Sequence, residues 1–446
     1  MPLFGTDGVR GVYGEHPITE AFCDELIHAV ITTSSELGLR PRRVLLGSDT
    51  RPSREKLVSS FVDAFSLRGI DVMALGVVPS PLLAYSVANS SYDLGLMVTA
   101  SHNPSSDNGF KFFNAEGRKF PVIWEERVER HLGANDRSSQ QNLVVGSMKE
   151  IDSGLFEKYR MACAKVLREI EVNYELTIVV DCANGAWSET APALLSAMGF
   201  HVIPVGQFDK SNQINDGCGS TSPRFIRDQV LMRNADLGIA FDGDGDRLIM
   251  VDHLGNTVNG DQILYLLAKD AKERGEDVPG VVGTVMTNGA LNQVLQEQGI
   301  SFSRTAVGDR NVMEEMEARG WHLGGETSGH VINSRLSPAG DGLFTAIQVL
   351  ATICRTKRAL NELLGEFVLF DQVHDSVVID DTSSALEDPS VQAIIEKIRS
   401  RDDVSQVVVR PSGTEPVVRI MVEGVQLNKV KAYVESIRRS LVKAST

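Results

Sequence analysis

The stretch Leu237-Gly238-Ile239-Ala240-Phe241-Asp242-Gly243-Asp244-Gly245-Asp246 joins a short apolar run directly to three aspartates. The run at 237–241 predicts a buried strand, and the two glycines let the chain bend at its end. Three carboxylates on such a bend can surround one hard divalent cation. Without a cation to neutralise them, charges this close would repel each other. The stretch therefore predicts a strand that ends in a metal site formed by Asp242, Asp244 and Asp246.

These aspartates have other possible interpretations. An EF-hand calcium loop also begins D-x-D-x-D, but it requires Gly at its sixth position and Glu at its twelfth, where this chain has Arg247 and His253, so it is excluded. Two alternatives stay open at this point. One is a phosphatase-like strand whose first aspartate is a nucleophile, and the other is a solvated acidic turn.

Working outward, one pattern of strand, loop, amphipathic helix, glycine and second strand occurs three times. The first strands lie at 44–47, 178–180 and 281–285, the glycines are Gly69, Gly199 and Gly299, and the second strands lie at 70–75, 200–205 and 300–306. Strands that alternate with helices predict right-handed βαβ crossovers. We predict three similar α/β units without inferring a duplication, because glycine follows helices in most proteins.

A polar motif follows the next strand of each unit. Strand 94–98 leads into 99–104, the strand ending at Phe241 leads into the aspartates, and strand 321–323 leads into 324–330. Open α/β sheets bind ligands beyond the carboxyl ends of their strands. The three motifs are therefore expected to build one shared active site.

The pattern changes after about residue 365. We predict a strand at 373–379, a helix at 390–400, a hairpin from 404–409 and 417–422, and a closing helix at 427–442. Polar segments at 135–141 and 387–389 are expected to be surface loops or boundaries. The predicted fold class is α/β, with three similar α/β/α domains with mixed, mostly parallel sheets at 1–150, 151–253 and 254–365, and a smaller α+β domain at 366–446.

Composition narrows the class of protein. A chain of 446 residues suggests three or four domains, and a formal net charge of −15 argues against a nucleic-acid partner. Five scattered cysteines without a C-x-x-C pair suggest neither a disulfide framework nor a zinc site, which fits a reducing cytoplasm. The N-terminus lacks the apolar core of a secretory signal, and the apolar-leaning stretch 343–354 is too short to span a bilayer, so no membrane partner is expected.

Two further motifs carry polar groups. No Walker A motif, Rossmann glycine motif or G-x-S-x-G is present, so Ser101 in Thr99-Ala100-Ser101-His102-Asn103-Pro104 needs another interpretation. A phosphoserine beside a metal would suit it, and a serine that caps a turn is the alternative. The turn at 410–416 offers Arg410, two hydroxyls and backbone N–H groups. This combination of donors favours a phosphate-binding turn over a turn that only closes a hairpin.

Four of these motifs, at 99–104, 242–247, 325–330 and 410–414, have the order and spacing found in the α-D-phosphohexomutase superfamily, which the whole chain resembles. Within it, the stretches 4–11 and 215–220 and the chain length are similar to those of the bacterial branch that acts on glucosamine phosphate. One position departs from that branch, because Thr327 stands where glutamine is expected.

The resemblance implies a role for each matched residue. Ser101 would carry a phosphoryl group, with Mg²⁺ held against it by Ser101, Asp242, Asp244 and Asp246. The catalytic group would further comprise Arg10, His102, Lys111 and Arg247. The substrate-binding group would comprise Glu326, Ser328, His330, Arg410, Ser412, Gly413, Thr414 and Arg419.

Three of these roles keep an alternative. Lys111 is the candidate general acid/base, but a lysine needs a lowered pKa to accept a proton, and pairing with phosphate is its other possible role. His102 is expected to orient the serine loop rather than to transfer protons. His330 either serves the substrate or satisfies a backbone carbonyl.

The implied reaction interconverts glucosamine 6-phosphate and glucosamine 1-phosphate through glucosamine 1,6-bisphosphate, on the route to UDP-N-acetylglucosamine and cell-wall precursors. The implied cofactors are one Mg²⁺ per chain and glucosamine or glucose 1,6-bisphosphate as activator. A hexosamine phosphate, a second copy of the chain in a homodimer and an activating kinase are the expected partners. The alternatives are a phosphoglucomutase or phosphomannomutase, and a sugar-phosphate-binding protein without activity.

Overall fold

The computed structural model describes residues 3–133, 148–149, 153–168, 170, 172, 176–365, 367–412 and 417–445, so the predicted loop at 135–141 lies outside the described residues. Contacts divide the chain into two compact units. The first comprises Met1–Val282 and Gly308–Leu364, and the second comprises Gly283–Val307 and Gly365–Thr446. Among the described residues, none of the helices combines the length and apolar character that a membrane span requires.

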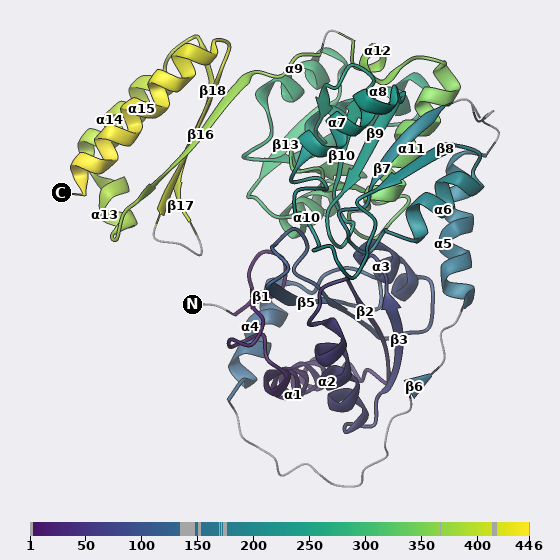
Figure 1. Cartoon of the computed structure of the whole chain (residues 1–446). Coiled ribbons are helices and arrows are strands. Elements are labelled where there is room, and N and C mark those ends of the chain that lie inside the picture. The colour runs from purple at the N-terminus through teal and green to yellow at the C-terminus, as the bar shows by residue number, and fades with distance from the viewer. Residues whose placement is uncertain are drawn as a thin grey trace. The chain divides into compact units, whose positions relative to one another are not determined.

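The first sheet has six strands in the order β1-β5-β4-β2-β3-β6 (Figure 1). Strand β2 pairs in parallel with β3 and β4, β3 pairs in parallel with β6, and β5 is antiparallel to β1 and β4. The strands are β1 Val9–Val12, β2 Arg43–Ser48, β3 Asp71–Val77, β4 Leu94–Val98, β5 Asp107–Phe113 and β6 Met148–Lys149. The helices are α1 Glu20–Glu36, α2 Arg54–Ser66, α3 Ser80–Ala88 and α4 Val122–His131.

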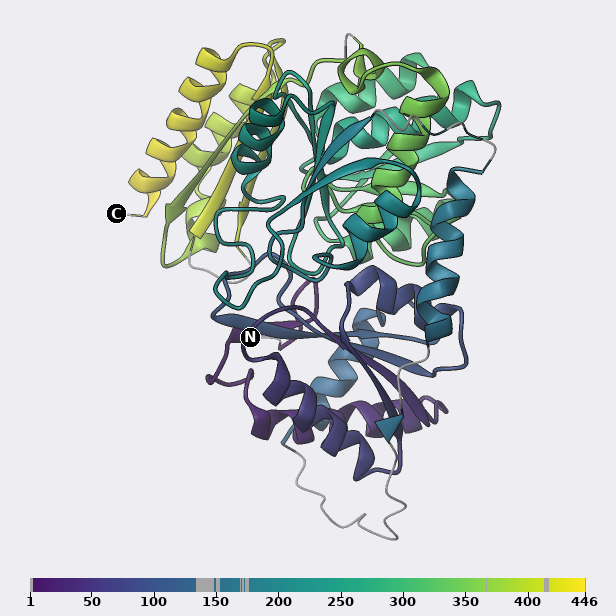
Figure 2. The ribbon, with the colours of Figure 1, turned by 45° about the vertical axis from the view of Figure 1, so that its right-hand side comes forward.

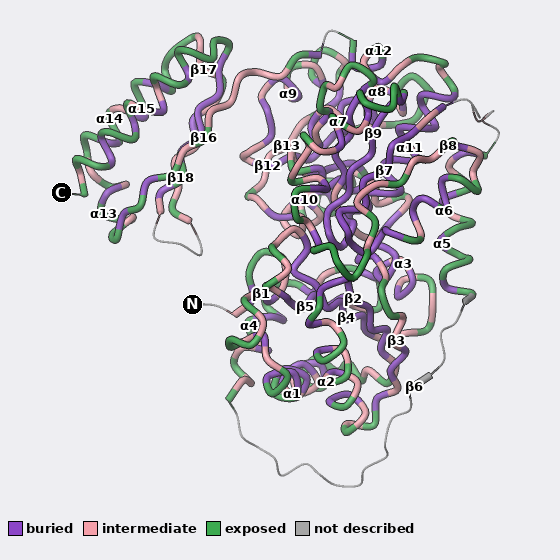
Figure 3. The backbone as a smooth tube through the Cα atoms, in the orientation of Figure 1, coloured by how far each residue is buried: buried purple, intermediate pink, exposed green. Residues whose placement is uncertain are grey.

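Alternation along β2 explains why helices cover both faces of this sheet. Val44 and Leu46 are buried in a cluster with Leu26, Phe61 and Trp124 from α1, α2 and α4. Leu45 points the other way, into a cluster formed with α3 and α5. Because successive side chains of a strand face opposite sides, an uninterrupted apolar strand requires cover on both. Figure 3 accordingly shows buried residues along the strands of this sheet and exposed residues on α2 and α5.

The second sheet has the order β11-β10-β9-β7-β8. Figure 2 shows this part of the chain in blue-green to teal. Strand β7 pairs in parallel with β8 and β9, while β10 is antiparallel to β9 and β11. The strands are β7 Thr177–Asp181, β8 His201–Val205, β9 Leu237–Phe241, β10 Leu248–Asp252 and β11 Thr257–Val258. The helices that precede or connect them are α5 Ser153–Val166, α6 Thr190–Ala197 and α7 Pro223–Arg233.

The third sheet has the order β13-β12-β14-β15, with β12 parallel to β14 and β14 antiparallel to β15. The strands are β12 Gly280–Thr284, β13 Ser301–Thr305, β14 Leu323–Gly325 and β15 Val331–Asn333. The helices are α8 Gly260–Glu273, α9 Gly289–Glu297, α10 Asp309–Arg319, α11 Gly342–Thr356 and α12 Leu360–Leu364.

The C-terminal part of the second unit is a three-stranded antiparallel sheet in the order β16-β18-β17. Helices α14 and α15 pack on it through a cluster that contains Val391, Ile395, Val430 and Ile437. The elements are β16 Asp371–Val378, α13 Thr382–Glu387, α14 Pro389–Arg399, β17 Val404–Pro411, β18 Val417–Gly424 and α15 Leu427–Ala444.

The predicted α/β class and the three repeated units are confirmed. The predicted glycines Gly69, Gly199 and Gly299 all have positive φ shortly after their helices, where a side chain would be strained. Two details differ. Trp321 and His322 precede β14 rather than forming part of it, and 387–389 is a tight junction between α13 and α14, because the Asp388 side chain caps α14. The four domain boundaries stay predictions.

Candidate active site

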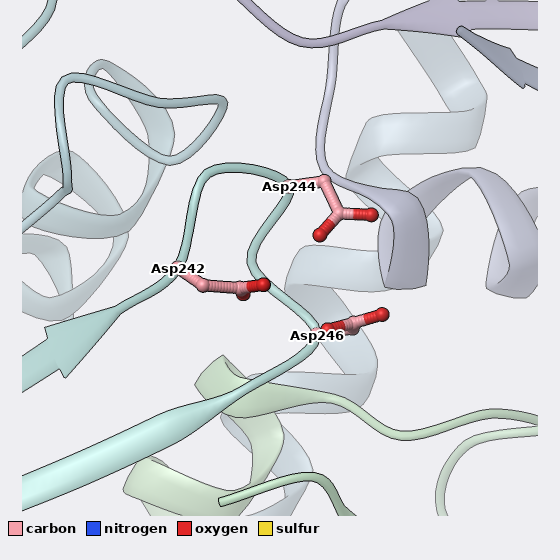
Figure 4. A group of neighbouring side chains, drawn as sticks. All are labelled: Asp242, Asp244 and Asp246. Carbon is pink, nitrogen blue, oxygen red and sulfur yellow. The ribbon is translucent and has the colours of Figure 1, made fainter. Parts of the chain in front are cut away.

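The first two polar motifs follow β4 and β9 directly, as the sequence predicts, and the third begins within β14, which includes Gly324 and Gly325, and continues beyond it. The aspartate loop bends tightly between β9 and β10, and its three side chains gather on the same side of the bend (Figure 4). Gly245 allows this bend with a φ of +79°, and its carbonyl accepts a hydrogen bond from the indole Nε1 of Trp187 at 3.0 Å. A side chain at Gly245 would collide with that indole, so the loop requires glycine there.

The geometry of the three aspartates fits a divalent cation. Asp242, Asp244 and Asp246 are buried, and each can offer a carboxylate oxygen within 4.8 Å of the others. Buried atoms Oδ1 of Asp244 and Oδ1 of Asp246 have no hydrogen-bond partner among the described residues. Burial, together with repulsion from Asp246 and Asp244, raises the pKa of Asp242 to about 7. A hard cation would satisfy Oδ1 of Asp244 and also Oδ1 of Asp246, which lies 3.6 Å from His330 Nδ1, and it would offset this repulsion, so the residues present suit Mg²⁺.

Ser101 lies against the first of these carboxylates. Its Oγ donates a hydrogen bond to Oδ2 of Asp242 at 2.6 Å, and its backbone N–H donates to Oγ1 of Thr99 at 2.9 Å. The residue has a φ of +51°, which is uncommon for serine. This conformation and the buried contacts point the hydroxyl at the aspartate cluster.

The guanidinium of Arg51 holds the serine loop from inside. Arg51 is fully buried and donates to the backbone carbonyls of Ser101 at 3.0 Å, Asn103 at 2.8 Å and Asp107 at 2.8 Å, and also to that of Pro104. Asp49 accepts from Arg51 Nε at 3.0 Å and from Thr99 at 2.6 Å. Sequence reasoning missed both residues, although 49–51 follows β2 at the same edge of the sheet as the motifs that it did select.

Lys111 on β5 pairs with three carboxylates. Its Nζ lies 2.7 Å from Asp244, 3.0 Å from Asp246 and 2.9 Å from Asp7. Burial lowers the pKa of Lys111, but these three anions outweigh it and hold the pKa well above its usual range. Lys111 is therefore a cation in this arrangement, which favours charge pairing over proton acceptance, and its general-base role stays a prediction.

A second group of charges adjoins the aspartates, and it joins the predicted Arg10 and His330 to Asp7, Lys119 and Asp309, which the sequence did not predict. Lys119 pairs with Asp7 and lies 2.5 Å from Asp309, and Asp7 also pairs with Arg10. Buried His330 lies 3.6 Å from Asp246 and 3.5 Å from Asp309. Burial lowers its pKa, but the two carboxylates raise it to about 9, so His330 is a cation at neutral pH. It faces charged groups of the site rather than satisfying a carbonyl.

The remaining predicted catalytic residues surround Ser101. His102 Nδ1 lies 3.3 Å from Ser101 Oγ, and burial with the nearby Arg247 and Arg10 lowers the His102 pKa to about 3. His102 is thus neutral, as an orienting residue would be. Arg10 donates to Asn103 at 3.1 Å. Arg247 donates its backbone N–H to Asp242 at 3.1 Å, and its buried Nε has no hydrogen-bond partner among the described residues.

The loop at 325–330 lies on the N-terminus of α8. The backbone N–H of Gly260 donates to the Thr327 carbonyl at 3.1 Å, and the Thr327 hydroxyl donates to buried Asp261 at 2.9 Å. Glu326 accepts from the backbone N–H of Gly308 at 3.0 Å, and Ser328 is exposed. Thr327, which stands where glutamine is expected, therefore ties the loop to α8, while the side chains of Glu326 and Ser328 stay accessible.

The predicted phosphate turn belongs to the second unit. Arg410 and Arg419 are directly paired across β17 and β18, so their side chains leave the same face of the sheet. Two arginines placed directly opposite each other concentrate positive charge on that face of the sheet. The backbone N–H of Ser412 donates to Val417 at 2.8 Å, which closes the hairpin. Gly413 and Thr414 lie outside the described residues.

Family models for the phosphoglucomutase/phosphomannomutase proteins match the chain in four parts. The three α/β/α domain models match residues 1–139, 157–255 and 259–369, and the C-terminal domain model matches residues 377–440. Together the four matches account for most of the chain in the expected order.

Solved structures share this fold. A phosphoglucomutase/phosphomannomutase family protein from Burkholderia thailandensis has a TM-score of 0.80 at 24% identity, covering 99% of this chain and 97% of that one. An Aspergillus fumigatus N-acetylphosphoglucosamine mutase, solved in complex with GlcNAc-6P and magnesium, has a TM-score of 0.66 at 18% identity, covering 100% and 96%.

Curated relatives are more similar in sequence. A phosphoglucosamine mutase from Alcanivorax borkumensis is 40% identical over 99% of this chain and 98% of its own length. One from Delftia acidovorans is 40% identical over 94% of each chain. Four domain matches in order, and relatives this similar over nearly the whole length, show that the chain belongs to the phosphoglucosamine mutase family of phosphohexomutases.

Proposed function

We propose that this protein interconverts glucosamine 6-phosphate and glucosamine 1-phosphate through a phosphoryl group on Ser101. The observation that carries the proposal is the 2.6 Å contact between Ser101 Oγ and Asp242 in a buried, acidic site between two sheets of the first unit. A serine so placed can exchange a phosphoryl group with a sugar beside a cation.

In the first half-reaction, O1 of glucosamine 6-phosphate attacks the phosphorus on Ser101. The bond from phosphorus to Ser101 Oγ breaks, and the O1 proton passes to Lys111, so that dephosphorylated Ser101 and glucosamine 1,6-bisphosphate result. The bisphosphate then turns over. In the second half, Ser101 Oγ attacks the 6-phosphoryl group, the bond from phosphorus to O6 breaks, and O6 takes the proton from Lys111. This restores phosphoserine and releases glucosamine 1-phosphate.

The charges around Ser101 suit this transfer. Asp242, Asp244, Asp246 and Ser101 would hold Mg²⁺, which when bound supplies stabilisation of negative charge on the phosphoryl group. Arg10, Arg247 and Lys111 add positive charge around the same group, and phosphoryl transfer depends mainly on such positioning and charge. Lys111 is the proposed donor and acceptor for the sugar hydroxyl proton. To accept that proton it must first be neutral, which a cation bound to Asp244 and Asp246 would favour by offsetting two of the anions that raise the Lys111 pKa.

Substrate binding is assigned to two groups of residues. Glu326, Ser328 and His330 would bind the sugar, and Arg410, Ser412, Gly413, Thr414 and Arg419 would bind the phosphate that does not react. Because the sugar must bind in two opposite orientations, a phosphate site that recognises either end serves both half-reactions. Glucosamine or glucose 1,6-bisphosphate would restore any enzyme that has lost its phosphoryl group.

Glucosamine phosphate is expected to be the preferred substrate, with glucose 6-phosphate slower by roughly 10-fold or more in kcat/KM. The two sugars differ at C2 by an ammonium and a hydroxyl, and a site that hydrogen-bonds this group discriminates strongly. The measurement is kcat/KM for glucosamine, glucose and mannose 6-phosphates at saturating Mg²⁺ and matched bisphosphate. A preference for glucose or mannose would reassign the chain to phosphoglucomutase or phosphomannomutase activity, and binding without any turnover would make it a sugar-phosphate-binding protein.

Arg410→Ala is expected mainly to raise KM, because it removes a charged contact to the phosphate that does not react. A charged hydrogen bond contributes about 1.5–3 kcal/mol, which corresponds to roughly a 10- to 100-fold change in KM. The matched control is Arg439→Ala, since Arg439 is an exposed arginine of the same unit that pairs with Glu435 at 2.7 Å. Steady-state kinetics with sugar phosphates that do not distinguish the two variants would remove Arg410 from the substrate site.

The remaining expectations concern the cell. A homodimer, an activating kinase and a cytoplasmic location stay predictions. Sedimentation of the purified protein and mass analysis of Ser101 before and after incubation with bisphosphate would test the first two.

A further inference from the structure

Asn215 lies between the serine loop and the aspartate loop. Its side-chain Nδ2 donates to the backbone carbonyl of Ser101 at 2.8 Å and to that of Asn103 at 3.2 Å. The residue begins the stretch 215–220, whose role neither the reaction nor the metal site explains. Asn215 follows β8 in the second sheet, whereas the serine loop joins β4 to β5 in the first. One amide therefore connects loops from two sheets at the reacting serine.

Asn215 and the Ser101 carbonyl pack closely against Gly243, which lies between two candidate metal ligands. A Cβ atom on Gly243 would lie 2.6 Å from the Ser101 carbonyl oxygen and 2.8 Å from Asn215 Nδ2. Gly243 separates Asp242 from Asp244. The serine carbonyl, the Asn215 amide and the backbone between two candidate metal ligands are thus packed against one another, so a shift of the amide changes the distance from serine to aspartates.

The loop that carries Asn215 is itself fixed to the second sheet. The backbone N–H of Asn215 donates to Ala183 at 2.9 Å, and the Asn184 side chain donates to the Gln213 carbonyl at 2.9 Å. Buried Asp181, at the end of β7, accepts the backbone N–H of Gly219 at 2.6 Å. Asn215 has a φ of +61°, which asparagine tolerates better than most residues. These hydrogen bonds fix the position of the Asn215 amide independently of its contacts with the serine loop.

Arg51 and Asn215 share the same two acceptors but have different tasks. A backbone carbonyl has two lone pairs, so Ser101 and Asn103 can each accept from both donors. The other bonds of Arg51 go to Asp49, Pro104 and Asp107, all within the first sheet and its loops. Arg51 therefore maintains the internal shape of the serine loop, and Asn215 sets its position relative to the aspartates.

We propose that Asn215 is a positioning residue, which holds phosphoSer101 in register with the aspartate loop for both phosphoryl transfers. The inference rests on the proposed function. Because a reacting group displaced by about 1 Å can lose on the order of 100-fold in rate, loss of the amide should lower kcat by roughly 10- to 100-fold. The sugar-binding residues lie on other loops, so KM should change by no more than about 2-fold.

Two substitutions distinguish the effect of the amide donor from the effect of the backbone conformation at residue 215. Asn215→Asp keeps the shape and the tolerance of positive φ but turns an oxygen toward two carbonyls. Asn215→Gly keeps the positive φ and removes the donor without adding charge. The control is Asn234→Asp, since Asn234 is an exposed asparagine in the same part of the fold, with a φ of +49° at the end of α7.

Each variant is measured in two ways, by kcat and KM for glucosamine 6-phosphate and by hydrogen exchange of peptides covering 99–109. Faster exchange in the serine loop and a lowered kcat are expected for both Asn215 variants, with a larger kcat loss for aspartate, and neither effect is expected for Asn234→Asp. A variant that is merely less stable would exchange faster throughout the fold, so faster exchange confined to the serine loop separates positioning from stability.

The outcomes distinguish this inference from the function on which it rests. Unchanged exchange in the serine loop, or faster exchange with an unchanged kcat, would overturn the positioning role. If the unmodified protein turned over no sugar phosphate, the proposed function would fail, while faster exchange confined to the Asn215 variants would still support the structural part of the inference.

Discussion

Ser101→Ala is expected to lose mutase turnover by at least about 1,000-fold, because alanine has no oxygen to carry the phosphoryl group between the two ends of the sugar. The fold should survive. Ser101 contributes no large apolar side chain to the core, and the free-energy cost of a positive φ is similar for alanine and serine. The measurements are kcat with glucosamine 6-phosphate and mass analysis of the peptide that contains residue 101, which should carry phosphate only in the unmodified protein.

Ser106→Ala is the matched control, since Ser106 is an exposed serine of the same loop whose hydroxyl contacts only Asp107 among the described residues. It should keep both activity and phosphorylation at Ser101. Normal turnover by the Ser101→Ala protein would rule out the phosphoserine mechanism, whatever the control does.

Asp244→Asn is expected to lower kcat by on the order of 100-fold and to raise the Mg²⁺ concentration needed for half-maximal rate. Asparagine keeps the size of the side chain but removes one of three negative charges from a site whose bound metal contributes several kcal/mol of charge stabilisation. It also leaves Lys111 with one fewer anion at 2.7 Å. A titration of rate against Mg²⁺, with reversal of chelator inhibition, measures the effect.

Asp252→Asn serves as the control. Asp252 is also buried and ends β10, but its carboxylate accepts from the backbone N–H groups of Leu254 at 2.9 Å and Asn256 at 2.8 Å. This variant should lose stability without a change in Mg²⁺ dependence. Equal Mg²⁺ dependence for Asp244→Asn and the unmodified protein would instead support a solvated acidic turn.

The sequence predicted the parts of the site that lie at strand ends. Asp242 to Asp246 and the serine loop were found because a continuous apolar strand must be buried, and the loop after it must emerge at the edge of the sheet. The antiparallel strands β5 and β10 were not predicted, since each returns directly from a functional loop and has no helix before it. Lys111 was selected through the family resemblance, and its place on β5 explains why it lies beside the aspartates.

The residues that escaped prediction depend on contacts between distant segments. Asp7 and Lys119 lie 112 positions apart, and Asp309 is a further 190 positions beyond Lys119. No local pattern reports such a pairing. The charged state of His330 has the same origin, because its pKa is raised by Asp246 of the aspartate loop and by Asp309 at the start of α10. Arg51 could have been found, since it follows β2 at the edge already selected.

The central claim is that the phosphoryl group on Ser101 becomes the 1-phosphate of the product. The most direct test loads Ser101 with an isotopically labelled phosphoryl group, mixes the enzyme with an equal amount of unlabelled glucosamine 6-phosphate and Mg²⁺, and stops the reaction within one turnover. The account predicts label in glucosamine 1-phosphate and unlabelled phosphate on Ser101. Formation of glucosamine 1-phosphate with the label still on Ser101 would contradict it.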